Sequence, residues 1–210
     1  MRKKVDLDSW VRRAHFEFFR TFDEPYYGVC VRVDCTKAYA AAKRKGYSFF
    51  LYYLYQSIAA AQRVEAFRLR IEEGEVFRYD QIDAGSTLMR PDGTFGFGYY
   101  TYSEAIETFM AESGREVERV RGTTGLERRD VPNIIRYSAL PWLDFMSLSH
   151  ARRFAAGDSC PWISFGKMTE ENGRRSMPMS IHVHHALVDG VDVGRYVECF
   201  QDLMNAEPID

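Results

Sequence analysis

The segment that most constrains the fold is Ser180–Gly190, SIHVHHALVDG, near the end of the chain. Its first half reads as a strand, because apolar side chains alternate with His182 and His184. The dipeptide Asp189-Gly190 breaks this strand, and apolar residues then recur at helical spacing. His185 is therefore expected at a strand-to-helix junction, where a scaffold can hold a side chain firmly and expose its tip.

Strands and helices are mixed along the rest of the chain without strict alternation. The expected elements are a helix after Asp8 or Ser9, a strand at Tyr27–Val33, a helix at about 48–63, strands at Glu75–Tyr79 and Thr94–Tyr100, a helix from Ser103 and a final helix carrying Val193 and Met204. This order predicts the α/β class, an α+β two-layer sandwich with a mixed sheet and flanking helices. The absence of a linker or repeat predicts a single domain over residues 1–210.

Composition excludes several classes of function. A formal net charge of -2 argues against bulk attraction to nucleic acid. No apolar run is long enough to span a bilayer, and the charged N-terminus lacks a signal-peptide core, so we expect a cytoplasmic protein without a membrane partner. Its four cysteines are expected to be reduced thiols. The high aromatic share, 15%, favours a sheet-rich fold with a lined cavity.

Histidine chemistry suggests a role for the junction. Imidazole titrates near neutral pH, so a firmly held His185 suits removal of a proton from an alcohol. A structural histidine is the plain alternative. His182 and His184 could also form an H-x-H metal pair, although no carboxylate or cysteine is spaced to complete it. We therefore predict a general base and no metal.

Five motifs, in order along the chain, carry a resemblance to the chloramphenicol acetyltransferase family. They are Trp10–Glu17, similar to the family's opening helix; Phe67–Ile71, similar to its FRMAM-type strand; Ser138–Trp142, similar to its S-A-x-P-W segment; Ser164–Lys167, with serine in place of a threonine; and His184–Gly190, which matches its signature. The resemblance runs nearly end to end. It implies the CoA-dependent acyltransferase fold in a type A homotrimer, with each active site shared between neighbouring subunits.

The resemblance also implies a mechanism. His185 is expected to take a proton from the hydroxyl of a small-molecule alcohol, which attacks acetyl-CoA, the co-substrate, directly. Ser138 would donate a hydrogen bond to the oxyanion, and Ser164 would assist through water. Asp189 would pair with Arg12 to hold the geometry, rather than act as a relay in a hydrolytic triad.

The acceptor pocket is where the chain departs from the family. Tyr27 and Phe95 match aromatic residues that contact chloramphenicol, the antibiotic that gives the family its resistance role. Phe97 stands at a position that is small in the family, and His150 replaces an apolar pocket residue. Added bulk and a polar ring could exclude chloramphenicol in favour of another xenobiotic or alcohol, whereas Phe97 could equally be simple core.

The CoA side departs as well. Lys167 is kept and is expected to meet a CoA phosphate. Met168 replaces an aromatic residue, and Ser48 stands where a second lysine is usual. Trp142 and Trp162 are expected in the core rather than on the cofactor.

Two other functions stay open. One is a catalytically inactive small-molecule-binding protein that retains the fold. The other is a much-reduced relative of the 2-oxoacid dehydrogenase acyltransferases, which share this fold but carry lipoyl and linker regions. The presence of Arg12, Ser138, His185 and Asp189 together favours an active transferase.

Overall fold

The computed structural model describes residues 1–129, 131–152 and 158–206. Within them the main sheet has seven strands, in the order β2-β10-β8-β7-β5-β6, with β9 paired to β10. Their bounds are β2 Tyr26–Asp34, β5 Asp83–Met89, β6 Phe95–Tyr100, β7 Ile134–Ala139, β8 Trp162–Phe165, β9 Thr169–Glu171 and β10 Arg174–His184. β7 runs parallel to β5 and β8, and the remaining pairs are antiparallel. The predicted mixed sheet is confirmed.

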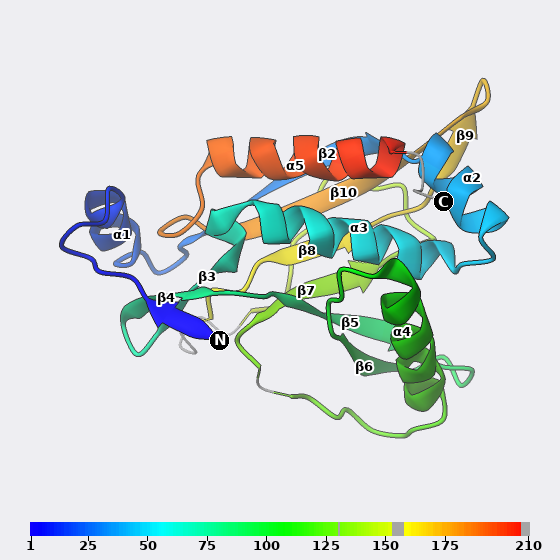
Figure 1. Cartoon of the computed structure of the whole chain (residues 1–210), viewed down its shortest axis with the longest axis horizontal. Coiled ribbons are helices and arrows are strands. Elements are labelled where there is room, and N and C mark those ends of the chain that lie inside the picture. Colours follow the sequence, from blue (N-terminus) through cyan, green and yellow to red (C-terminus); the bar gives the residue numbers. More distant parts are fainter. Residues whose placement is uncertain (130, 153–157, 207–210) are drawn as a thin grey trace.

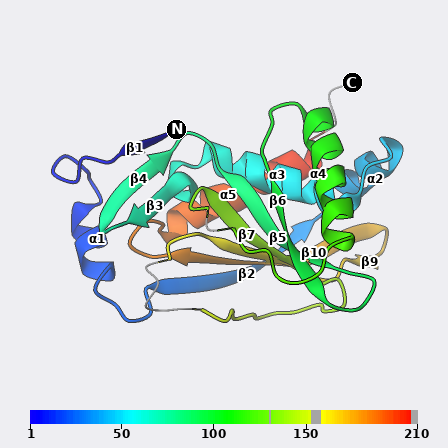
Figure 2. The same ribbon diagram turned by 90° about the horizontal axis from the view of Figure 1, so that it is seen from below.

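Helices cover one face of this sheet. α3 (Phe49–Arg63) and α5 (Gly190–Asn205) pack on each other above it, as Figure 1 shows. α2 (Thr36–Arg44) contacts both, and α4 (Ile106–Arg121) packs on β6. Seen from below, the sheet lies in front of α3 and α5 (Figure 2), so its other face is turned away from them. The two-layer arrangement predicted from the order of elements is confirmed.

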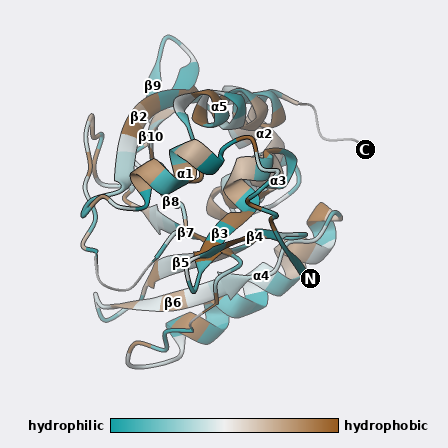
Figure 3. Cartoon of the chain, turned by 90° about the vertical axis from the view of Figure 1, so that its left-hand side faces the viewer, coloured by the Kyte–Doolittle hydropathy of each residue, from teal (hydrophilic) through white to brown (hydrophobic). Residues whose placement is uncertain are grey.

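The core lies between the sheet and these helices. On β10, Ile181 and Val183 are fully buried toward the helices, as their alternation predicts. In α5, Tyr196 and Phe200 are likewise fully buried. α4 carries both hydrophilic and hydrophobic residues, as expected for a helix with one buried side (Figure 3). Within the described residues, no helix has the length and apolar character that crossing a membrane requires.

A second, three-stranded sheet has the order β1-β4-β3. Its strands are β1 Arg2–Lys4, β3 Leu69–Glu72 and β4 Glu75–Tyr79. The predicted strand at Phe67–Ile71 is partly wrong, because a 3-10 turn, η1, occupies Glu65–Arg68. Arg70 explains the late start of the strand: its buried guanidinium bonds to the carbonyls of Phe67 and Leu69 and to those of Pro132 and Ile134.

The first helix also begins later than predicted. α1 spans Arg13–Phe19, rather than starting near Trp10. Neither Asp8 nor Ser9 caps it: the Ser9 hydroxyl donates to the Asp6 carboxylate at 2.7 Å, and the Asp8 carboxylate accepts from Nη1 of Arg13 at 2.5 Å. Short polar side chains that bond locally in this way compete with helix formation. The turn places Arg12 immediately before α1.

Candidate active site

His185 lies one residue beyond β10, in the turn that leads into α5. Its backbone N–H donates to the carbonyl of Pro25 at 2.8 Å, which fixes the main chain at this corner. The imidazole stacks on Phe19 with ring centroids 3.8 Å apart, and Tyr27 lies against it at 4.6 Å. Nδ1 is buried, so Nε2 is the ring nitrogen left to meet a substrate. We call Arg12, Phe19, Tyr27, His185 and Asp189 the His185 cluster.

Asp189 joins the two charged partners of this cluster. One carboxylate oxygen accepts a hydrogen bond from Nη1 of Arg12, and the other lies 3.3 Å from Nδ1 of His185. The second contact lacks hydrogen-bond geometry, so the carboxylate acts on the ring through its charge. The Arg12 guanidinium holds the pKa of Asp189 below its usual value. Asp189 therefore stays ionised beside the imidazole.

The hydroxyl of Tyr27 is a polar group of the cluster that is left without a hydrogen bond in the described part of the chain. It is also buried. Burial, with Asp189 and Asp192 nearby, raises the pKa of Tyr27 to about 12, so the hydroxyl stays protonated. A buried hydroxyl without a partner costs free energy until another group bonds to it.

Ser138, Ser164 and Ser180 occupy one row across β7, β8 and β10. Side chains in register on neighbouring strands share a face of the sheet, so the first two hydroxyls are neighbours. Ser164 is fully buried, and its Oγ lies 3.4 Å from Nε2 of His150. Burial, reinforced by nearby cationic groups, lowers the pKa of His150 to about 4. His150 is therefore neutral near pH 7 and can orient the Ser164 hydroxyl.

A cavity of about 340 Å³ lies on the same face as this row. Ser138 lines it, together with the aromatic rings of Phe97, Tyr99 and Trp162. The pairing of β6 with β5 explains why these aromatic side chains lie together. Phe97 pairs with Thr87 and Tyr99 with Gly85, and both partners line the cavity on this face. Phe97 lies in this wall, so it is available to contact a bound acceptor. Trp162, expected in the core, is a wall residue as well.

Charged residues complete the wall, and the sequence reasoning missed them. They are Arg128, Arg129, Arg136, Arg152 and Asp158. No local motif marks them, since they come from three separate stretches of chain that only the fold brings together. We call the whole set of wall residues the arginine-lined cavity.

Within one chain, Ser138 and His185 do not meet. Ser138 is level with Ser180, and His185 follows five residues later, about 16 Å along the strand. Two strand spacings, about 10 Å, separate β7 from β10. Tyr27, against the imidazole, pairs with Val183 on the helix-covered face, whereas Ser138 points to the other face. One bound alcohol cannot reach both groups of the same chain.

Four other predicted residues lie outside both regions. Phe95 packs edge-on against Phe97, with ring centroids 5.8 Å apart, and is 47% exposed. Lys167 is exposed just beyond β8, and its N–H donates to the carbonyl of Leu143 at 2.7 Å. His150 packs behind the cavity, against Trp162. The expectation that Trp142 is core is wrong, because it is 58% exposed in the loop after β7.

The H-x-H pair has partners of its own. His182 bonds through Nδ1 to the Ser180 hydroxyl at 3.2 Å, and Nδ1 of His184 accepts the Ala186 N–H at 3.2 Å. In the part of the chain that the structure describes, no three histidine, cysteine or acidic side chains gather as metal ligands. Both rings are therefore explained by local hydrogen bonds and packing.

Comparison with known proteins decides the family. The profile described as Chloramphenicol acetyltransferase matches residues 2–201. The chain is 30% identical over 207 residues to chloramphenicol acetyltransferase 3 of Escherichia coli, covering 97% of each, and 26% identical to a chloramphenicol acetyltransferase of Proteus mirabilis, covering 94% of this chain and 92% of the relative. The chain belongs to the chloramphenicol acetyltransferase family. The resemblance inferred from the five motifs is confirmed.

The chloramphenicol acetyltransferase family is a family of acyl-CoA-dependent acyltransferases, so the predicted class of enzyme is confirmed as well. A solved structure described as chloramphenicol acetyltransferase superposes with a TM-score of 0.89 and 30% identity, covering 97% of this chain and 100% of that one. A probable dihydrolipoamide acetyltransferase from Listeria monocytogenes superposes at 0.68 with 11% identity, covering 97% of this chain and 94% of that chain. The second match shows a shared fold alone.

Proposed function

We propose that this protein is an acetyl-CoA-dependent O-acetyltransferase that acylates a hydroxyl of a small molecule, with His185 as the general base. The arrangement of His185 carries the proposal: the ring is stacked on Phe19, its Nδ1 is buried beside the Asp189 carboxylate, and Nε2 is left free. An alcohol is a weak nucleophile at neutral pH, so a positioned base is what such a transfer needs.

The reaction proceeds in two steps. Nε2 of His185 accepts the proton of the acceptor hydroxyl while the oxygen attacks the thioester carbonyl of acetyl-CoA. The tetrahedral intermediate then expels the CoA thiolate, which regains the proton from the imidazolium. Asp189, 3.3 Å from Nδ1, stabilises the imidazolium through its charge, and Arg12 keeps that carboxylate ionised and in place.

The oxyanion needs a donor, and we assign that role to Ser138. One well-placed donor of this kind lowers the barrier by about 3 kcal/mol. Ser164, the neighbour of Ser138 in register, would assist through a bound water, oriented by His150. We assign Lys167, which is exposed beyond β8, the role of meeting a CoA phosphate.

Because Ser138 and His185 lie on opposite faces of one chain, we propose that each active site forms between two subunits of a trimer. The His185 cluster of one subunit would then face the arginine-lined cavity of the next, with Tyr27, Phe95, Phe97 and His150 around the acceptor. A closed ring of three chains repeats this contact three times. Acetyl-CoA is a cytoplasmic metabolite, and the four cysteines are free, so we place the enzyme in the cytoplasm.

The activity is tested by following free thiol released from acetyl-CoA with chloramphenicol and other alcohols as acceptors. We expect acceptor-dependent release that falls about 10³-fold in His185→Ala, with an unchanged circular dichroism spectrum and trimer mass. Release within threefold of wild type in that variant would remove His185 from the mechanism. Absence of acceptor-dependent release from the wild-type protein would favour an inactive binding protein instead.

The shared site has its own test. Subunits carrying His185→Ala and subunits carrying Ser138→Ala are unfolded, mixed in equal amounts and refolded together. If each site takes His185 from one subunit and Ser138 from the next, random mixing in a ring restores about one quarter of wild-type activity. Each variant refolded alone is the control. Activity of the mixture no higher than these controls would overturn the shared site and leave the base assignment standing.

A further inference from the structure

Among the residues that the structure describes, four arginines and one carboxylate line the cavity that holds Ser138. Two of the arginines have acidic partners: Arg136 pairs with Asp158 in the wall, and Arg152 pairs with Glu24 at 2.7 Å. Across residues 1–129, 131–152 and 158–206, neither Arg128 nor Arg129 has a carboxylate within salt-bridge distance. Among the described residues the wall therefore holds more arginines than carboxylates, and the acid that acts on Arg129 from outside the wall is Glu116 of α4, through its charge.

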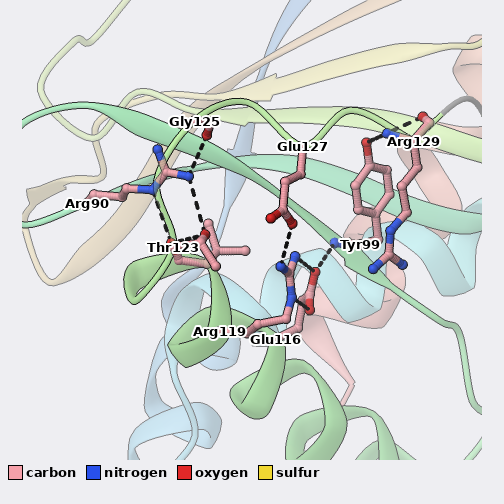
Figure 4. Close-up of polar contacts among 9 residues, drawn as sticks. Arg90, Tyr99, Glu116, Arg119, Thr123, Gly125, Glu127 and Arg129 are labelled. Atoms are coloured by element: carbon pink, nitrogen blue, oxygen red, sulfur yellow. Dashed lines mark hydrogen bonds and ion pairs between the residues drawn. The ribbon is translucent and has the colours of Figure 1, made fainter.

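The segment that bears Arg128 and Arg129 is anchored, although it has no regular secondary structure. Arg119 of α4 bonds to Glu127 at 2.8 Å, and Nη2 of the buried Arg90 donates to the carbonyl of Gly125 at 2.7 Å. Figure 4 shows both contacts on the stretch of chain that leads to Arg129. Glu127, the acid next to Arg128, is thereby occupied by Arg119.

Tyr99 of β6 fixes Arg129 itself. The Tyr99 hydroxyl accepts the Arg129 backbone N–H at 2.6 Å, and the guanidinium lies over the ring, 5.0 Å from its centroid (Figure 4). Tyr99 also lines the cavity, so its ring holds the exposed guanidinium beside the wall. Phe97 and Trp162 add aromatic rings to the same wall.

We infer that the acceptor is an anionic hydroxyl compound whose carboxylate is held by Arg128 and Arg129, with its ring or carbon skeleton against Phe97 and Trp162. The inference rests on the proposed function and names its substrate class. Planar guanidinium groups bind carboxylates through paired hydrogen bonds, and the cavity has the volume of a small-molecule site. A neutral acceptor such as chloramphenicol would offer these two guanidinium groups no carboxylate.

Binding of a matched pair of probes tests this inference without needing turnover. Isothermal titration calorimetry compares 4-(hydroxymethyl)benzoate with its neutral amide, 4-(hydroxymethyl)benzamide. We expect the benzoate to bind about tenfold more tightly, with a preference that falls as salt rises. The double variant Arg128→Gln, Arg129→Gln should lose the preference, and the corresponding Lys variants should keep part of it. Arg121→Gln, which removes an arginine paired with Glu118 on α4, is the matched control and should change nothing.

Equal affinity for the two probes, or a preference that survives in the double Gln variant, would overturn the inference. Thiol release from acetyl-CoA separates this result from a failure of the proposed function. If chloramphenicol is acetylated and the charge preference is missing, the substrate class alone is wrong. If no acceptor releases thiol while the benzoate preference holds, the anion site stands and the transferase does not.

Discussion

The His185 cluster and the arginine-lined cavity differ in how their charges are balanced. In the cluster, Asp189 meets both Arg12 and the imidazole of His185. In the cavity, Arg136 and Arg152 have carboxylates, whereas two further arginines have none among the described residues. A region whose charges are already paired within the protein suits a chemical step that is the same for every acceptor. A region with unmatched charge suits selection of a particular acceptor, because the ligand supplies what the protein lacks.

After the loss of His185 itself, the largest effect should come from removing the Ser138 hydroxyl, the one cavity group with a proposed part in the chemistry. Ser138→Ala is expected to lower kcat about 100-fold, since it removes the proposed oxyanion donor while leaving the His185 cluster intact. Steady-state thiol release measures it. Ser138→Thr keeps the hydroxyl and serves as the control, with most of the rate retained. A kcat within threefold of wild type for Ser138→Ala would reduce the cavity to a binding surface and sharpen the division between the two regions.

Local patterns predicted the backbone that holds His185, although not the stacking of Phe19 on its ring. Alternation along Ser180–Gly190 fixed the strand, the Asp-Gly break fixed the start of α5, and both agree with the structure. The pairing of Arg12 with Asp189 came from the family resemblance and is present, although α1 begins at Arg13. Period-2 and period-3.6 patterns encode such elements directly, because each depends on residues close in sequence.

The cavity could be predicted only in part. Phe97 and Ser138 stood in recognisable motifs, whereas Arg128 and Arg129 lie in an irregular segment with no periodic signal. Their position depends on Arg90 and Arg119, which bond to that segment from other elements. Contacts of this kind arise from tertiary packing, and a single sequence does not display them. The same reason explains Trp142, whose apolar ring suggested core although its loop exposes it.

The next effect concerns His184, which lies on the cavity face of β10, beside His185 in sequence but in a different environment. Burial lowers the pKa of His184 to about 4, while the unfolded chain keeps the ordinary value near 6.5. Between those values the unfolded state binds more protons, so stability is full above pH 6.5 and is lost as pH falls toward 4. Urea unfolding should show that His184→Gln removes about 2 kcal/mol of the stability that the wild-type protein loses from pH 7 to pH 5, while His150, whose pKa is also about 4, continues to contribute in the variant.

A second neutral replacement, His184→Asn, is the control, because it removes the same titrating group with a different side chain. Arg152 and His185 also oppose protonation of His184, and Asp158 favours it, but desolvation is the main cause of the shift. If the free energy of unfolding depends on pH identically in His184→Gln and wild type, protonation of His184 does not destabilise the folded protein. Water would then reach this face of the sheet more readily than the burial of His184 indicates.

A smaller effect is expected within the His185 cluster. Asp189→Asn keeps a hydrogen-bond partner for Arg12 but removes the charge beside the imidazole, so kcat should fall about tenfold. Arg12→Met should give a similar loss, and the double variant should be little worse than either, because the two residues act as one unit. A double-mutant cycle on kcat measures this coupling. If the reductions in kcat multiply in the double variant, Arg12 and Asp189 act independently on His185.

The smallest effect tests the one group of the His185 cluster that lacks a partner. Tyr27→Phe removes a buried hydroxyl without a hydrogen bond among the described residues, so the free protein should become more stable by about 0.5–1 kcal/mol. If the hydroxyl is reserved for the acceptor, KM for the acceptor should rise a few-fold while kcat stays within twofold. Urea unfolding and steady-state kinetics measure the two changes, with Tyr26→Phe as the contrast, since that hydroxyl already donates to the carbonyls of Asp158 and Cys160 and its loss should destabilise. A stability gain with no change in KM would place the hydroxyl outside the acceptor site, and the cluster would then bind only through its rings and the imidazole.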